Sequence, residues 1–218
     1  MGRKAFRQFT EQPFRNTIEE LHHTSPIKSV LDVGCGYGDQ IAVLLELDAF
    51  DPIFGLERQD TIAEMTKERF ASDAKVAIQN VNVLSDEIPS SVDLVTLNYV
   101  SFYFDLSEKR ALFRKLANAL SEKGVVLVCQ YFPNIEPIQI ALCKRRGDFT
   151  FQKRIEMYFG NKALYGEVLL NEALTPFKMA ERWETLLGVA SEAGLSLRQL
   201  TNADPFYYSL FLVFERSR

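Results

Sequence analysis

The stretch that decides the fold is Val30-Leu31-Asp32-Val33-Gly34-Cys35-Gly36-Tyr37-Gly38. Its first residues predict a short buried strand, and the glycines predict a tight turn into a helix that runs from Gln40 to Leu47. Glycine lacks a Cβ atom, so it accepts a positive φ and lets a ligand come close to the backbone. The stretch therefore predicts the start of a βαβ unit with a ligand site at its turn.

The spacing of the glycines argues against a dinucleotide. A dinucleotide site has the pattern Gly-x-Gly-x-x-Gly, which would place the third glycine at position 39, where this chain has Asp39. The third glycine is Gly38 instead. Asp32, two residues before the turn, also suits a ligand with a positive charge better than a pyrophosphate. The turn therefore favours a cationic ligand.

Apolar strands alternate with amphipathic helices along the next hundred residues. We expect strands at 52–57, 75–79, 92–97 and 125–129, and helices at 60–70 and 107–121. In helix 60–70, Ile62, Met65 and Phe70 lie on one face. In helix 107–121, Lys123-Gly124 is expected to end the helix. The alternation predicts an α/β fold with a doubly wound, mostly parallel sheet.

The remaining segments surround this sheet. We expect a helix at 179–193 and a closing hairpin of strands 195–200 and 206–214, which would add one antiparallel strand. Residues 134–177 are charged and aromatic and too long for an ordinary connection, so they predict a helical insertion or lid after strand five. Residues 1–28 read as an N-terminal helical cap. The 218 residues are expected to form a single domain.

Composition excludes several classes of protein. Lys plus Arg is 25 and Asp plus Glu is 29, for a net charge of −4, which argues against a broad grip on nucleic acid. The three cysteines are odd in number and lack the spacing of a metal site, so they argue against disulfides and against a structural metal. They fit a reducing cytoplasm. No apolar run approaches the length that a membrane helix needs. Monomer and homodimer both stay open.

Asp32 and the three glycines, with Glu57 at the end of the second strand, resemble the class I S-adenosylmethionine (SAM) dependent methyltransferases. The resemblance runs from about Val30 to Arg216. It implies a Rossmann-like, seven-stranded sheet, with SAM as cofactor and S-adenosylhomocysteine as product. It also implies that the glycine motif holds the methionine part of SAM, and that Glu57 accepts hydrogen bonds from both ribose hydroxyls, as two carboxylate oxygens can.

Three further segments fit the same resemblance. Asn82-Val83 falls where the family has an Asp that binds the adenine amino group, and the carbonyl of Asn82 can accept the same bond. Asn98 and Tyr99 match the position where family members line the site near the transferable methyl. Glu122-Lys123-Gly124 resembles the family's L-x-P-G-G stretch, without the proline and the second glycine. The cofactor-binding residues that the resemblance implies are Asp32, Gly34, Cys35, Gly36, Gly38, Glu57, Arg58, Asn82, Val83, Asn98 and Tyr99.

The expected reaction is methyl transfer from SAM to a small molecule by in-line displacement. Positioning and exclusion of water provide much of the rate, so a general base is optional and no catalytic residue is assigned. His22 and His23 precede the first strand, whereas α/β sheets bind ligands at the carboxyl ends of strands. We therefore expect this histidine pair to lie at the wrong end of the sheet.

The acceptor is expected to meet aromatic walls, which suit an apolar or cationic molecule. Arg145, within the basic run 144–146, is a candidate for binding a carboxylate or phosphate on the acceptor. The alternative is that the aromatic side chains pack the insertion onto the sheet and that the basic run is a solvated face. The candidate acceptor residues are Phe102, Tyr103, Tyr131, Arg145, Tyr158 and Tyr165.

Other readings stay open. The segment 97–112 is also similar to the enzyme that makes carboxy-SAM. A nicotinamide oxidoreductase and a non-catalytic SAM-binding subunit are further alternatives on the same scaffold. A nucleic-acid acceptor is disfavoured, because Asn98-Tyr99-Val100-Ser101 lacks the Asn/Asp-Pro-Pro-Tyr or Phe signature of base-modifying enzymes.

Overall fold

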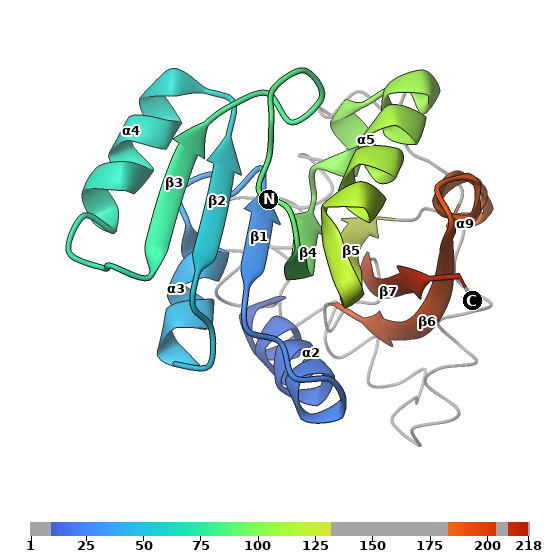
Figure 1. Cartoon of the computed structure of the whole chain (residues 1–218), viewed down its shortest axis with the longest axis horizontal. Helices are drawn as coiled ribbons and strands as arrows, with labels where there is room; N and C mark the ends of the chain where they lie inside the picture. Colours follow the sequence, from blue (N-terminus) through green and yellow to red (C-terminus); the bar gives the residue numbers. More distant parts are fainter. Residues whose placement is uncertain (1–9, 132–182, 204–208, 218) are drawn as a thin grey trace, which may run out of the picture.

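The computed structural model describes residues 10–131, 183–203 and 209–217, which form an α/β fold around a seven-stranded sheet (Figure 1). The strands are β1 (Val30–Val33), β2 (Ile53–Glu57), β3 (Val76–Asn80), β4 (Val92–Asn98), β5 (Leu120–Tyr131), β6 (Leu195–Asn202) and β7 (Ser209–Arg216). The helices are α2 (Glu11–Thr24), α3 (Asp39–Glu46), α4 (Asp60–Arg69), the 3-10 turn η2 (Ser101–Tyr103), α5 (Leu106–Ala119) and α9 (Trp183–Glu192).

The strand order is β3-β2-β1-β4-β5-β7-β6. Strands β2 and β3 are added on one side of β1 and the later strands on its other side, so the strand order reverses between β1 and β4. β1 pairs in parallel with both neighbours, so that Asp32 lies between Gly55 of β2 and Thr96 of β4. β7 is antiparallel to β5 and to β6. The predicted mostly parallel, doubly wound sheet with an antiparallel C-terminal hairpin strand is therefore confirmed.

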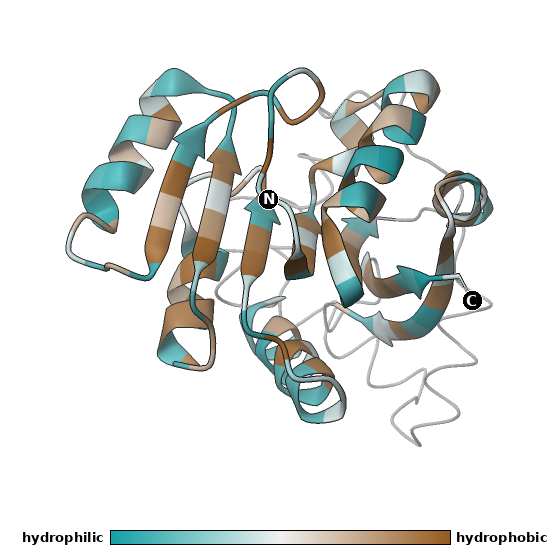
Figure 2. Ribbon diagram, viewed as in Figure 1, coloured by the Kyte–Doolittle hydropathy of each residue, from teal (hydrophilic) through white to brown (hydrophobic). Residues whose placement is uncertain are grey.

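Helices cover both faces of the sheet. On one face, α5 and α9 pack through Phe113, Leu116 and Leu186. On the other face, α2 and α3 pack through Phe14 and Ile41 with neighbouring residues. The central strands β1 and β4 are mostly apolar, with polar residues such as Asp32 and Thr96 between the apolar ones, as the mixed colours in Figure 2 show.

The join between α5 and β5 differs from the expectation. The helix ends at Ala119 and β5 begins at Leu120, so Gly124 lies inside the strand instead of ending the helix. A Cβ atom at position 124 would come within 2.8 Å of the Val92 carbonyl oxygen. The glycine is therefore needed for the close approach of β4, which the sequence pattern cannot reveal.

The buried face of α4 was also predicted wrongly in part. Met65 is 51% exposed, whereas Ala63 and Thr66 are buried. Phe70, which follows the helix, is buried as expected. The correction matters because Thr66, a polar residue, faces the glycine turn and not solvent.

Several predicted segments fall outside the described residues. These are residues 1–9 of the N-terminal cap, the start of the helix at 179, and the whole insertion 134–177 with Arg145, Tyr158 and Tyr165. Within the cap, α2 is helical from Glu11 to Thr24, and it buries Phe14, Ile18 and Leu21. Across the described ranges, no helix is both long and apolar enough to span a bilayer.

Candidate functional site

A cavity of about 440 Å³ opens at the carboxyl ends of β1, β2, β3 and β4. This volume lies within the range of about 300–1,000 Å³ that small-molecule sites occupy. Ligands of open α/β sheets bind at this edge, beside the point where the strand order reverses. The cavity is lined by Val33–Tyr37, Asp39, Gln40, Leu56–Gln59, Ile62, Val81–Val83, Asn98–Val100, Tyr103 and Phe104.

The glycine loop, residues 34–38, forms one wall of the cavity, and its three glycines have different reasons to be glycine. All three have a positive φ, at +69°, +53° and +75° in chain order. A Cβ atom on Gly34 would come within 2.6 Å of the Val100 side chain, and one on Gly38 would come within 2.3 Å of the Phe70 ring. A Cβ atom on Gly36 would meet nothing within 4 Å. Gly36 therefore leaves free space beside a cavity that it lines.

Glu57 ends β2 with its carboxylate beside this loop. Its Oε2 accepts a hydrogen bond from the Gly36 N–H at 3.1 Å, and its Oε1 accepts one from the Gln59 N–H at 2.8 Å. A carboxylate offers about four acceptor positions, so one backbone bond on each oxygen leaves capacity on both. Glu57 can thus hold the loop and still accept two hydrogen bonds from a ligand in the cavity.

Asp32 lies beneath the loop and does not line the cavity. The Thr96 hydroxyl donates to its Oδ1 at 2.6 Å, and its Oδ2 has no partner among the described residues. Burial raises the pKa of Asp32 to about 7; the Thr96 hydrogen bond opposes this shift and the charge of Glu57 adds to it. A buried carboxyl group with an open oxygen favours a cation nearby, because a positive charge would stabilise its ionised form.

The segment after β3, residues 81–86, forms hydrogen bonds within itself. Asn82 Oδ1 accepts the Leu84 N–H at 3.1 Å, and the Asn82 N–H donates to Asp86 Oδ2 at 2.8 Å. Asn82 Oδ1 keeps a second lone pair. Val83 is buried and lines the cavity. The predicted pair 82–83 therefore lies at the cavity, with its loop shape fixed by local hydrogen bonds.

The end of β4 brings two more predicted residues to the cavity. Asn98 Nδ2 donates to Gln40 Oε1, and Asn98 Oδ1 has no partner among the described residues. Tyr99 adopts φ +55°, which is rare for a residue with a side chain, and its N–H donates to the Cys129 carbonyl at 2.8 Å. Strained backbone of this kind concentrates at functional sites.

Some lining residues were not expected from the sequence. Asp39 and Gln40 reach the cavity because α3 begins directly after the glycine loop. Gln59 and Ile62 reach it from the start of α4, and Phe104 from beyond β4. The helix starts gave the available signal, since residues in the first turn after a glycine loop face the same ligand.

The six predicted acceptor residues differ in their position relative to the cavity. Tyr103 lines the cavity and is 62% exposed. Phe102 does not line it; its ring lies 4.3 Å from the Tyr103 ring, centroid to centroid, and packs against the core. Tyr131 ends β5, but its side chain is outside the described residues, as are Arg145, Tyr158 and Tyr165. Of the six, only Tyr103 is placed at the cavity.

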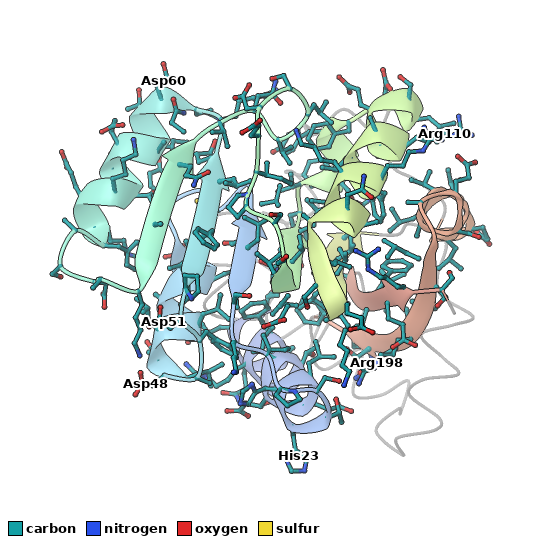
Figure 3. All side chains as sticks on the ribbon, in the orientation of Figure 1. His23, Asp48, Asp51, Asp60, Arg110 and Arg198 are labelled. Carbon is teal, nitrogen blue, oxygen red and sulfur yellow. The ribbon has the colours of Figure 1, made fainter. Side chains whose placement is uncertain are left out.

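Within the part of the chain that the structure describes, the cysteine and histidine residues add no reactive group to the cavity. Burial raises the pKa of the Cys35 thiol, which keeps its sulfur protonated. His22 Nδ1 accepts the Ile27 N–H at 3.3 Å, and its ring lies edge-on to Phe50. Figure 3 shows His23 at the end of α2, opposite the end of the molecule that holds Asp60. Among the residues described, no three His, Cys, Asp or Glu side chains gather as a metal site requires.

Comparison with known sequences and structures identifies relatives of this arrangement. Residues 30–124 match the family model of a methyltransferase domain. No match was found among the curated proteins.

Three solved structures resemble the whole fold. N-methyltransferase NodS from Bradyrhizobium japonicum WM9 has 13% identity and a TM-score of 0.63, with 96% of this chain and 97% of that one covered. A putative O-methyltransferase from Nostoc punctiforme PCC 73102 has 23% identity and a TM-score of 0.67, with 98% of this chain and 58% of that one covered. Magnesium protoporphyrin IX methyltransferase from Synechocystis PCC 6803, solved with S-adenosylhomocysteine, has 15% identity and a TM-score of 0.62, with 95% and 83% covered.

Proposed function

We propose that the chain is a class I SAM-dependent methyltransferase, which transfers a methyl group from SAM to a small-molecule acceptor; the match of residues 30–124 to a methyltransferase domain and the shared fold support this. The observation that carries the proposal is one cavity that joins the glycine loop, Glu57, the 82–83 segment and the end of β4. These groups come from four strand ends, and a folded parallel sheet is what brings them together.

The residues present fit SAM. Gly36 leaves free space where a side chain would stand, and Glu57 keeps one open acceptor position on each oxygen. Asp32 Oδ2 and Asn98 Oδ1 are buried acceptors without partners among the described residues, which suits a ligand that carries an ammonium group and a sulfonium. We assign the methionine part to the glycine loop and Asn98, with Asp32 contributing its charge from beneath the loop, and the ribose to Glu57. We assign the adenine to Asn82 and Val83.

The remaining proposed cofactor contacts are backbone or rim contacts. Cys35 contributes backbone and small volume, since its thiol is buried. Arg58 follows Glu57 at the exposed edge of the cavity. Tyr99 is buried and its strained backbone shapes the wall beside the reacting end. Gly34 and Gly38 allow the close packing that holds the loop in position.

When bound, SAM supplies a methyl carbon that its sulfonium has already activated for in-line attack by the acceptor. The protein's part is to orient the acceptor and to exclude water. Val100, Tyr103 and Phe104 give the cavity an apolar wall next to Asn98. With an activated methyl group, such positioning is sufficient for a good nucleophile, and no general base is assigned.

A small acceptor is supported by size and charge. The cavity has the volume of a small-molecule site, and the net charge of −4 disfavours nucleic acid. One similar protein is, by its name, a methyltransferase of magnesium protoporphyrin IX, which is a small molecule. Cys35 and Cys129 are free thiols, which fits a reducing cytoplasm.

The experiment that tests the proposal identifies the ligand directly. Purified protein is denatured and the released small molecules are measured by mass spectrometry, while SAM, S-adenosylhomocysteine and NAD are titrated by calorimetry. We expect SAM or S-adenosylhomocysteine to be released and to bind, and NAD not to bind. Release of carboxy-SAM would support a carboxy-SAM synthase instead. Failure of both adenosyl compounds to bind would overturn the proposal.

A further inference from the structure

We propose that Thr66 and Arg69 of α4 are positioning residues, which hold the glycine loop in the shape that binds SAM. Neither residue lines the cavity, so neither is expected to touch the cofactor. The inference rests on the proposed function, because it concerns how the proposed cofactor site keeps its geometry. It assigns to α4 a role in cofactor affinity that the glycine motif alone does not contain.

Thr66 carries the first part of the argument. Its side chain is buried, with 1% exposed, and its hydroxyl donates to the Gly36 carbonyl at 2.7 Å. The N–H of the same glycine donates to Glu57 Oε2 at 3.1 Å. Both hydrogen-bonding groups of Gly36 are therefore held, one by the strand that precedes α4 and one by α4 itself.

Arg69 lies one turn further along the helix and acts on the next peptide. Its Nη1 donates to the Tyr37 carbonyl and, at 3.0 Å, to Asp39 Oδ1. Its guanidinium carbon also lies 5.1 Å from the centroid of the Phe70 ring. Residues three apart share one face of a helix, so Thr66 and Arg69 reach two successive carbonyls of the loop from the same side.

The loop needs such support because of its own composition. Gly36 adopts φ +53° and Gly38 φ +75°, and glycine has the widest choice of conformations of any residue. A Cβ atom on Gly38 would come within 2.3 Å of the ring of Phe70, which follows α4, and within 3.2 Å of Thr66 Cγ2, so α4 and the residue after it lie against the loop. A loop that is ordered before the ligand arrives loses less entropy on binding. Removing a hydrogen bond from α4 should therefore weaken SAM binding without removing any contact to SAM.

The experiment compares two substitutions at one position by calorimetry with SAM and with S-adenosylhomocysteine. Thr66→Val keeps the shape of the side chain and removes the hydroxyl, whereas Thr66→Ser keeps the hydroxyl. We expect Thr66→Val to weaken both ligands by about threefold to tenfold, as the loss of one hydrogen bond allows. We expect Thr66→Ser to stay within about twofold of the wild type.

A variant elsewhere controls for general loss of stability. Asp93 accepts hydrogen bonds from the Lys28 and Ser29 N–H groups and from the Ser121 hydroxyl, at the opposite end of β1 and β4. Asp93→Asn should lower the melting temperature and leave the SAM affinity unchanged. If Thr66→Val does not fold, Arg69→Met, which should give a similar loss of affinity, takes its place.

Each outcome has one meaning. Unchanged affinity in Thr66→Val would overturn the inference. So would an equal loss in Thr66→Ser, since packing and not the hydroxyl would then be responsible, or an equal loss in Asp93→Asn. If the wild-type protein itself fails to bind SAM, the proposed function fails. If the wild type binds SAM and Thr66→Val binds it equally well, the proposed function stands and only this inference fails.

Discussion

The Gly36 N–H donates a hydrogen bond to Glu57 Oε2 at 3.1 Å, which joins the turn after β1 to the end of β2. The residue that we assign to the ribose is thus also a structural partner of the loop that we assign to the methionine part. A change at Glu57 should therefore alter both halves of the proposed cofactor site.

Glu57→Ala should weaken SAM binding by at least tenfold, because a hydrogen bond to a charged group is worth about 1.5–3 kcal/mol. The substitution also leaves the Gly36 and Gln59 N–H groups without their partner, so the melting temperature should fall by a few degrees. Calorimetry and thermal unfolding measure the two effects separately. An affinity equal to that of the wild type would show that Glu57 does not hold the ribose.

Gly36→Ala tests the free space beside the cavity, and Gly194→Ala is its matched control. Both glycines have a positive φ, and a Cβ atom on either would meet nothing within 4 Å. The left-handed backbone costs a side chain about 1–2 kcal/mol at each position, so both variants should lose similar stability. Only Gly36→Ala should lose SAM affinity, and Gly36→Val should lose more.

The measurement for this pair is a thermal unfolding curve and a SAM titration for each variant. Retained SAM binding in Gly36→Val would refute the placement of the methionine part against Gly36. Weakened binding in Gly194→Ala would instead mean that the loss comes from stability, because Gly194 follows α9 and lines no part of the cavity.

Asp32 should make SAM binding depend on pH. Its folded-state pKa is raised from 3.8 to about 7, so its contribution to stability is full below pH 3.8 and is lost as the pH rises through 7. A bound cation favours the ionised carboxylate, so binding should release a proton at pH 6 and should tighten from pH 6 to pH 8. Calorimetry in two buffers of different ionisation enthalpy measures the released proton.

Asp32→Asn is the control for that pH dependence. The amide keeps an acceptor for the Thr96 hydroxyl and removes the titrating group. We expect weaker SAM binding with a flat profile between pH 6 and pH 8, and a higher melting temperature than wild type at pH 8, because a buried charge is gone. A variant that keeps the wild-type slope would assign the pH dependence to another residue.

Asp93→Asn should destabilise the fold without affecting the cavity. Hydrogen bonds from Ser121 and from residues 28 and 29 outweigh the effect of burial and lower the pKa of Asp93. Their partial loss should cost about 1–2 kcal/mol, which corresponds to a fall in melting temperature of about 2–8 °C for a chain of this size. Because the pKa is lowered, this stability is lost as the pH falls, so the difference from wild type should shrink under acidic conditions. A constant difference down to low pH would contradict this account.

The sequence by itself determined the order of strands and helices, the glycine loop and the acids at positions 32 and 57. These features are local, since apolar periodicity and glycine conformation act over a few residues. It did not reveal that Asp32 lies beneath the cavity and not in its wall, or that Gly124 lies inside β5 where Val92 comes close. Both depend on neighbouring strands that are distant in the chain.

The tertiary structure also decided the use of α4. The sequence pattern placed Met65 on the packed face, yet Met65 is half exposed and Thr66 faces the glycine loop. The residue pattern of α4 cannot show which of its sides contacts the glycine loop, which lies about 30 residues earlier in the chain. That contact forms only when β1 pairs with β2 and the helices α3 and α4 pack beside these strands. Spacing along the chain thus predicted a cofactor motif, and packing between distant segments fixed the shape of that loop.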